Sequence, residues 1–206
     1  VYDGVCVDSN DVDLIEKTSG YAGFFKLNVY RLQHKTFAGG ITPVLHRECL
    51  ERGHAVVVLA YDPKLDKVVL LEQFRIGAMV NTDNPWLFEI IAGIVEAGES
   101  QQEVARREAL EEANCRLDSL EPICNYYPSP GGSSETTQLY CACVDSTNIG
   151  GIHGIEEEGE DIRVFTISYD EAVEWLQKGR LDNASAIISL QWLMLNRERL
   201  RAQARG

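Results

Sequence analysis

The sequence of 206 residues has little positive charge, because 19 Lys and Arg residues stand against 32 Asp and Glu residues for a formal net charge of −13. A general nucleic-acid binder needs clusters of basic side chains to contact phosphates, and so does a protein held at an anionic membrane surface. We therefore expect no nucleic acid and no membrane among its partners. An acidic site that meets phosphates through metal ions remains open.

Long apolar segments are also missing from the sequence. The longest unbroken run extends only from Ala55 to Tyr61, far short of a bilayer span. Residues 1–8 have neither a basic start nor an apolar stretch, so we do not interpret them as a signal peptide. These absences predict a cytoplasmic location.

The six cysteines form no C-x-x-C pair. Cys141 and Cys143 would share one face of a strand, but no second pair and no histidine at zinc spacing lies near them in the sequence. We interpret the cysteines as reduced thiols of a cytoplasmic protein and expect no zinc site.

Strands and helices alternate without a regular period, which predicts an α+β fold. Turn residues and apolar runs predict strands at 24–32, 41–46, 54–61, 67–73, 86–91, 138–144 and 162–167. Capping signals at Ser100, at Ser168 and at Asp182 or Asn183 predict three helices that end near 113, 178 and 201. We expect loops at 93–99 and 150–160. The strands expected before residue 50 indicate an N-terminal β subdomain at 1–50, ahead of a main domain at 51–206. The first 50 residues cannot make a stable core alone.

The helix after Ser100 has the clearest local signals. Ser100 and Glu103 form a capping box, and Asn114 can adopt the left-handed conformation that ends a helix. Three small residues at helical spacing form a stripe that can pack closely on a sheet: Ala105, Ala109 and Ala113.

The same helix carries three carboxylates, Glu108, Glu111 and Glu112, on adjoining faces. They repel one another, and Arg106 and Arg107 relieve that repulsion only in part, so a solvated Glu/Arg face is the ordinary alternative. A hard divalent cation would compensate the repulsion, since Mg²⁺ takes oxygen ligands and binds phosphate oxygens at the same time.

The spacing of six residues resembles the Nudix box, GX5EX7REUXEEXGU with U apolar. The matching residues are Gly93, Glu99, Arg107, Glu108, Glu111 and Glu112. Two positions depart from the pattern: Asn114 stands where the box has its last glycine, and Ala109 stands where a larger apolar residue is usual. Asparagine is the next best residue at positive φ, so the first departure weakens the match only slightly.

Resemblance to the Nudix family implies an α/β/α sandwich with a mixed sheet, here with a small N-terminal antiparallel β subdomain. It implies hydrolysis of a nucleoside diphosphate linked to another moiety, with Mg²⁺ as cofactor and Mn²⁺ as an alternative. Glu108 and Glu112 would be the main metal ligands, with Glu111 and the backbone carbonyl of Ala92 in addition. The resemblance implies catalytic roles for Glu112, Glu99 and Arg107. Glu99 and Arg107 would hold the loop and the helix in register. Gly93 would lie at the substrate.

Further segments resemble the bacterial ADP-ribose pyrophosphatase branch of this family: Arg52–Ala55, Glu72–Arg75, Pro85–Glu89 and Ser129–Glu135, with Pro130 at a position associated with ADP-ribose. This branch forms homodimers in which N-terminal strands complete the partner's site. The resemblance implies that Phe24 stacks on adenine from the partner subunit and that Arg47 reaches the partner's substrate. Arg75 would contact the diphosphate or ribose, and Glu135 the substrate.

Each of these assignments has an ordinary structural alternative. Phe24 could be a core aromatic residue, Arg75 a surface ion-pair residue and Glu135 a carboxylate on a loop surface. The catalytic base is implied to lie on the acidic loop 155–161, with Glu158 as the base and Glu160 as a metal ligand. Glu156 or Glu157 could be the base in place of Glu158. His153 could also act as a general base, by the chemistry of its side chain alone.

We therefore predict an enzyme that hydrolyses ADP-ribose to AMP and ribose 5-phosphate with a metal-activated water. The first alternative is another nucleotide sugar, such as GDP-mannose or ADP-glucose. The second is a non-catalytic Nudix domain that senses a nucleotide, although all four box glutamates are present.

Overall fold

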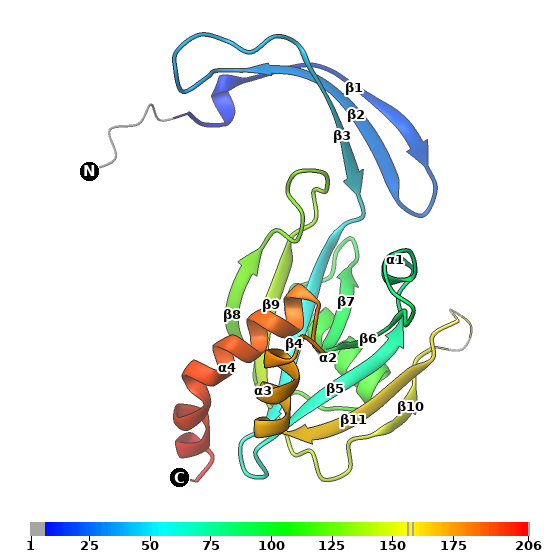
Figure 1. The fold of residues 1–206 in the computed structure, drawn as a ribbon, viewed down its shortest axis with the longest axis vertical. Coiled ribbons are helices and arrows are strands. Elements are labelled where there is room, and N and C mark those ends of the chain that lie inside the picture. The colour runs from blue at the N-terminus through cyan, green and yellow to red at the C-terminus, as the bar shows by residue number, and fades with distance from the viewer. Residues whose placement is uncertain (1–6, 156, 158, 206) are drawn as a thin grey trace. The chain divides into compact units, whose positions relative to one another are not determined.

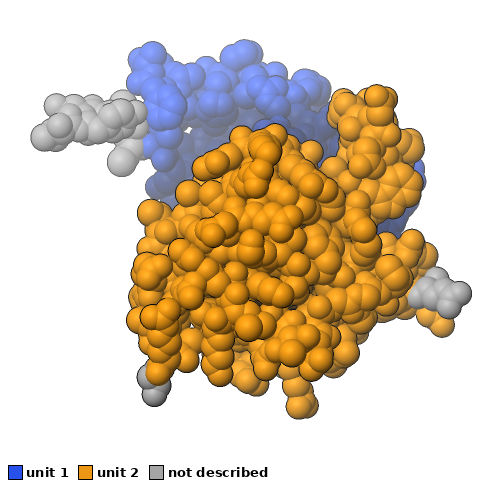
Figure 2. All heavy atoms as spheres, turned by 60° about the horizontal axis from the view of Figure 1, so that its bottom comes forward, with its two compact units in different colours: residues 1–53, 127–135 blue, residues 54–126, 136–206 orange. Residues whose placement is uncertain are grey.

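The computed structural model describes residues 7–155, 157 and 159–205. The chain divides into two compact units, one formed by residues 1–53 with 127–135 and the other by residues 54–126 with 136–206 (Figure 2). The sequence-based boundary near residue 50 stays a prediction, because the first unit also takes in a loop from the middle of the chain. Each unit is described by itself.

The larger unit is built on a mixed eight-stranded sheet (Figure 1). Six strands follow the order β10-β11-β5-β4-β9-β8, while β6 pairs with β5 and β7 pairs with β4. The pair β4–β9 is parallel, and the other pairs are antiparallel. The strands are β4 (His54–Asp62), β5 (Lys67–Phe74), β6 (Trp86–Glu89), β7 (Ile91–Val95), β8 (Glu121–Tyr126), β9 (Thr137–Cys143), β10 (Gly151–His153) and β11 (Ile162–Ser168).

Helices cover both faces of this sheet. The helices of the larger unit are α1 (Ile76–Met79), α2 (Gln101–Ala113), α3 (Tyr169–Gln177) and α4 (Ala184–Gln203), and the last three cover the sheet. Figure 1 shows α3 and α4 on one face and α2 on the other. Strand β4 explains this, because Val56 and Val58 belong to the apolar cluster under α2, while Val57 and Leu59 belong to the cluster under α3 and α4. The predicted α+β sandwich with a mixed sheet is confirmed.

Helix α2 forms where its local signals predicted it. Ser100 accepts a hydrogen bond from the N–H of Glu103, whose side chain accepts one from the N–H of Ser100. Asn114 ends the helix with φ 46° and ψ 38°, the conformation that the glycine of the box would adopt more easily. The alanine stripe is fully buried against the sheet: Ala105, Ala109 and Ala113. The remaining face of α2 is thereby free to present its carboxylates.

The smaller unit holds a three-stranded antiparallel sheet in the order β1-β2-β3, after a short 3-10 turn, η1 (Ser9–Asp11). Its strands are β1 (Val12–Ala22), β2 (Lys26–His34) and β3 (Leu45–Glu51). The predicted N-terminal antiparallel sheet is confirmed. Strand β1 is exposed along its whole length.

Several predicted boundaries are wrong. The expected strand 41–46 is instead β3 at Leu45–Glu51, because Pro43 has no N–H to give to the ladder. The expected strand 86–91 is divided into β6 and β7, and β7 extends to Val95 inside the expected loop. Strands β1 and β8 were not predicted; β8 contains Pro122, which lies at a register shift against β9. In the expected loop 150–160, β10 forms against β11.

Candidate active site

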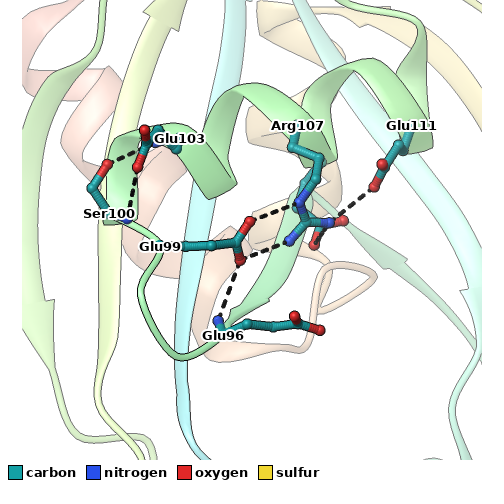
Figure 3. Close-up of polar contacts among 7 residues, drawn as sticks. Glu96, Glu99, Ser100, Glu103, Arg107 and Glu111 are labelled. Atoms are coloured by element: carbon teal, nitrogen blue, oxygen red, sulfur yellow. Dashed lines mark hydrogen bonds and ion pairs between the residues drawn. The ribbon is translucent and has the colours of Figure 1, made fainter.

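Arg107 on α2 joins the preceding loop to the helix (Figure 3). Its Nε and Nη2 donate to the two carboxylate oxygens of Glu99 at 3.3 and 3.4 Å. Its Nη1 donates to Glu108 and to Glu111, both at 3.0 Å. Burial lowers the pKa of Arg107, but the hydrogen bond to Glu99 and the nearby carboxylates outweigh it and raise this pKa above its ordinary value. A single guanidinium therefore holds three of the four box glutamates.

The fourth box glutamate, Glu112, is buried, with 4% of its surface exposed. Its Oε2 accepts a hydrogen bond from the backbone N–H of Ala92 on β7 at 2.9 Å. Burial raises the pKa of Glu112 to about 8; the Ala92 hydrogen bond opposes this, and the charge of Glu108 adds to it. The helix thus places a buried carboxylate against β7, where the charge of Arg75 offsets the effect of burial on its pKa only in part, a costly arrangement for a charged group.

Glu108 lies against Gly93, one residue further along β7. A Cβ atom at position 93 would come within 2.0 Å of Glu108 Oε1, so only glycine leaves the carboxylate its present place. Burial raises the pKa of Glu108 to about 7; Arg107 opposes this and Glu111 adds to it. Gly93, first predicted at the substrate, lies here in direct contact with a candidate metal ligand.

Arg75 lies at the end of β5 and precedes α1. Its Nε donates to both oxygens of Glu89 at 3.0 Å, and its Nη2 donates to Glu89 Oε2 at 2.7 Å. Burial lowers the pKa of Arg75, but Glu89 and, to a smaller extent, Glu112 and Glu160 raise it above its ordinary value. Arg75 therefore lies within electrostatic reach of the carboxylates on α2, and it also makes the ion pair that the structural alternative expected.

The acidic loop after β10 brings Glu160 near this group, since the charge of Glu160 adds to the raised pKa values of Glu108 and Glu112. The carboxylate of Glu160 accepts the N–H of Ile155 at 3.2 Å. Glu158, the predicted base, and Glu156 lie outside the described residues. The ring of His153 is within 3.0 Å of the carbonyl of Gly150.

Three predicted substrate residues belong to the smaller unit. Phe24, in the turn between β1 and β2, is 86% exposed and contacts Phe25; it is not a core aromatic residue. Arg47 lies on β3 and donates to the carbonyl of His46. Glu135 forms an ion pair with Arg52 at 3.3 Å. Their predicted contacts with substrate stay predictions.

The donor set fits a hard divalent cation. In the part of the chain that the structure describes, no three carboxylate, imidazole or thiol groups already converge as metal ligands would. The carboxylates of Glu108 and Glu112 lie on one helix face, Glu112 buried and the side chain of Glu108 15% exposed, and Glu108 shares the charge of Arg107 with Glu99 and Glu111. Oxygen donors of this type suit Mg²⁺ or Mn²⁺.

Sequence reasoning missed the role of Glu89 and Gln73 beside Arg75. Gln73 donates to Glu89 Oε2 at 3.2 Å, so the two residues act together on the arginine. In the sequence, both residues stand only within segments that resemble the ADP-ribose pyrophosphatase branch. Their meeting depends on the register between β5 and β6, in which Gln73 pairs with Leu87 and Leu71 pairs with Glu89, and no local pattern reveals that register.

Comparisons with known proteins now define the class. The model of the NUDIX domain matches residues 51–190. A solved structure described as an ADP compounds hydrolase has a TM-score of 0.68 at 18% identity, covering 98% of this chain and all of that one, which supports the fold. The chain belongs to the Nudix family.

The related sequences are more specific. An "ADP-ribose pyrophosphatase" of Escherichia coli K12 is 45% identical over 96% of this chain and 94% of its own length. One of Haemophilus influenzae is 44% identical over 90% of this chain and 87% of its own. A "GDP-mannose pyrophosphatase" of Pectobacterium atrosepticum is 32% identical over 89% and 94%.

Proposed function

We propose that the protein hydrolyses the diphosphate of ADP-ribose to AMP and ribose 5-phosphate. The carrying observation is the pair of carboxylates on α2, the buried Glu112 and the partly buried Glu108, in a chain 45% identical to an ADP-ribose pyrophosphatase over nearly its whole length. A diphosphate needs its negative charge compensated before water can attack phosphorus, and these carboxylates would bind the cations that compensate it.

Glu108 and Glu112 would hold Mg²⁺, or alternatively Mn²⁺, together with Glu111, Glu160 and the carbonyl of Ala92. When bound, the metal would neutralise the diphosphate and lower the pKa of a water molecule. Glu99 and Arg107 keep loop and helix in register, as their paired hydrogen bonds support. Arg75 would donate to the diphosphate, and Glu158 would take the proton of the attacking water.

We also propose a homodimer in which the smaller unit serves the partner's site. The support is that β1 is exposed along its length, with Val12, Leu14, Ile15 and Tyr21 among the exposed apolar side chains. Exposed apolar surfaces of this kind mark interaction sites, and a second copy of the chain is the partner we propose. In the dimer Phe24 would stack on adenine, Arg47 would reach the partner's substrate, and Glu135 would contact substrate as well.

Subunit complementation tests this arrangement. Co-expression of Phe24→Ala chains with Glu112→Gln chains forms mixed dimers that contain one intact composite site. We expect activity well above that of either variant alone, with a dimer mass in sedimentation. A monomer, or mixed dimers no more active than their parents, contradicts the shared site.

A panel of substrates tests the specificity. With Mg²⁺ present, ADP-ribose, ADP-glucose and GDP-mannose are compared by kcat/KM. We expect ADP-ribose to lead by at least tenfold. The relative named for GDP-mannose makes that sugar nucleotide the sharpest rival, and a lead for it contradicts the proposed substrate. Tight binding of ADP-ribose without turnover would instead indicate a non-catalytic sensor.

A further inference from the structure

Glu89 binds one defined edge of the Arg75 guanidinium. Nε and Nη2 of Arg75 lie on the same edge of the planar group, and both donate to Glu89. A bidentate contact of this kind fixes the plane of the guanidinium as well as its position. Among the residues that the structure describes, Nη1 of Arg75 has no hydrogen-bond acceptor, so the end edge formed by Nη1 and the second Nη2 proton stays open to an anion.

The carboxylate of Glu89 is itself held in place. Its side chain is only 12% exposed, and Gln73 donates to its Oε2 at 3.2 Å. The strand behind it is fixed as well, since Asn183, the N-cap of α4, donates to the carbonyl of Phe88 at 2.6 Å. Glu89 is therefore a rigid support, whereas a surface ion pair between two long side chains would be loosely held.

The register of β5 and β6 places the residues that hold Arg75 on the face of the sheet covered by α2. Glu89 lies opposite Leu71, and Leu71 belongs to the apolar cluster under α2. Gln73 lies on the same face, two residues further along β5. The guanidinium thus lies on the side of the sheet that carries Glu108 and Glu112, where the proposed diphosphate binds.

We propose that Glu89 is a positioning residue, which turns Arg75 so that its Nη1/Nη2 edge faces the diphosphate of the substrate. This inference rests on the proposed function for the identity of the substrate. Glu89 would not contact the substrate itself. Its carboxylate oxygens accept the hydrogen bonds of Arg75 Nε and Nη2, which would otherwise let Arg75 bind a phosphate in several orientations. The ordinary alternative is an ion pair that stabilises the fold and does nothing for the substrate.

A double-mutant cycle separates the two explanations. Glu89→Gln keeps the size of the side chain but removes the charge and presents an amide NH₂ to the arginine. We expect this change to raise KM for ADP-ribose roughly tenfold with kcat changed less than about threefold, as loss of a charge-assisted contact implies. In an Arg75→Ala background the same change should alter kcat/KM less than about twofold.

The matched control is Glu72→Gln. Glu72 precedes Gln73 on β5 and forms an ion pair with Arg163 on β11. The substitution therefore removes one carboxylate charge from the same sheet, as Glu89→Gln does. We expect its KM to equal that of the wild type. If Glu89→Gln lowers kcat/KM equally with and without Arg75, or leaves KM unchanged in an active enzyme, the positioning role is overturned.

A second readout does not depend on turnover. The ¹⁵N NMR signal of the Arg75 Nε–H is assigned by its absence from the spectrum of Arg75→Ala. This proton should exchange slowly with water in the wild type and at least tenfold faster in Glu89→Gln. Equal exchange rates overturn the inference even if ADP-ribose is the substrate. If the exchange rates differ as expected but ADP-ribose is not hydrolysed, the proposed function is wrong, while the positioning of Arg75 by Glu89 is supported.

Discussion

Glu112 is tied to Ala92 by a single hydrogen bond of 2.9 Å, from the backbone N–H of β7 to the carboxylate on α2. This bond fixes a buried carboxylate whose pKa stays raised, because the charge of Arg75 offsets the effect of burial only in part. It joins the helix of the Nudix box to the sheet at the point where the proposed metal ligands gather.

The first prediction concerns that carboxylate. Glu112→Gln should lower kcat/KM for ADP-ribose by on the order of a hundredfold to a thousandfold, because a metal ligand worth several kcal/mol in the transition state is lost. The fold should persist, since the amide oxygen can still accept the Ala92 N–H. Steady-state kinetics and a thermal melt measure the two effects.

Glu103→Gln is the control for this prediction. It makes the same change on the same helix, at a capping-box position where glutamine also caps. Its activity should remain within about twofold of the wild type. If both variants lose the same amount of activity, the activity depends on the total charge of α2 and not on Glu112 itself.

The second prediction concerns Gly93. A Cβ atom there would meet the flexible end of Glu108 within 2.0 Å, so Gly93→Ala should displace the carboxylate rather than the strand. We expect kcat/KM to fall at least about tenfold while the melting temperature falls by less than about 4 °C. Gly77→Ala, where the added Cβ meets open space, should leave activity unchanged. If Gly93→Ala instead lowers the melting temperature strongly while the Glu108 carboxylate keeps its position, this account is contradicted.

The third prediction concerns the end of α2. Asn114 has φ 46°, a conformation that costs an ordinary residue about 1–2 kcal/mol. Asn114→Ala should therefore lower the free energy of unfolding by about 1 kcal/mol, and Asn114→Gly should leave it equal or higher. Urea unfolding measures both, and equal stability of the two variants would contradict the strain.

These positions show why α2 and its carboxylates could be predicted from the sequence. The capping box, the alanine stripe and the box spacing are all local, so one stretch of chain contains the whole signal. By contrast, β1 was missed because it is exposed along its length and shows no alternation of apolar and polar residues. Strand β8 was missed because Pro122 argues against a strand, and only the bulge at the sheet edge accommodates it.

The candidate site divides in the same way. The residues of one helix could be placed from their spacing, whereas the hold of Glu89 on Arg75 depends on the register of two strands. Likewise, Arg107 was expected to join loop and helix, but its contacts with Glu108 and Glu111 follow from the rotamers it adopts in the fold.

The fourth prediction concerns acid stability. Partial burial raises the pKa of Asp66, but hydrogen bonds from Arg197 and Tyr61 and the charges of Arg197 and Arg201 outweigh it and lower this pKa to about 2. The folded-state pKa lies below the unfolded value, so the carboxylate stabilises the fold above pH 3.8 and loses that effect as the pH falls toward 2.

Urea unfolding between pH 7 and pH 2.5 measures this effect. Asp66→Asn, which tolerates the positive φ of this residue, should lower stability at pH 7 by about 1–2 kcal/mol. Its deficit relative to the wild type should shrink as the pH falls toward 2. Asp83→Asn, on an exposed turn, should show no such change. A deficit that is constant with pH would contradict the ion-pair account.

The most direct test of the central claim is a product analysis of ADP-ribose by ³¹P NMR, with Mg²⁺ and then with excess EDTA. We predict AMP and ribose 5-phosphate in equal amounts with Mg²⁺, and no products after chelation. Intact ADP-ribose with Mg²⁺ or Mn²⁺, cleavage to ADP and ribose, or turnover that persists in EDTA would contradict metal-dependent hydrolysis of the diphosphate.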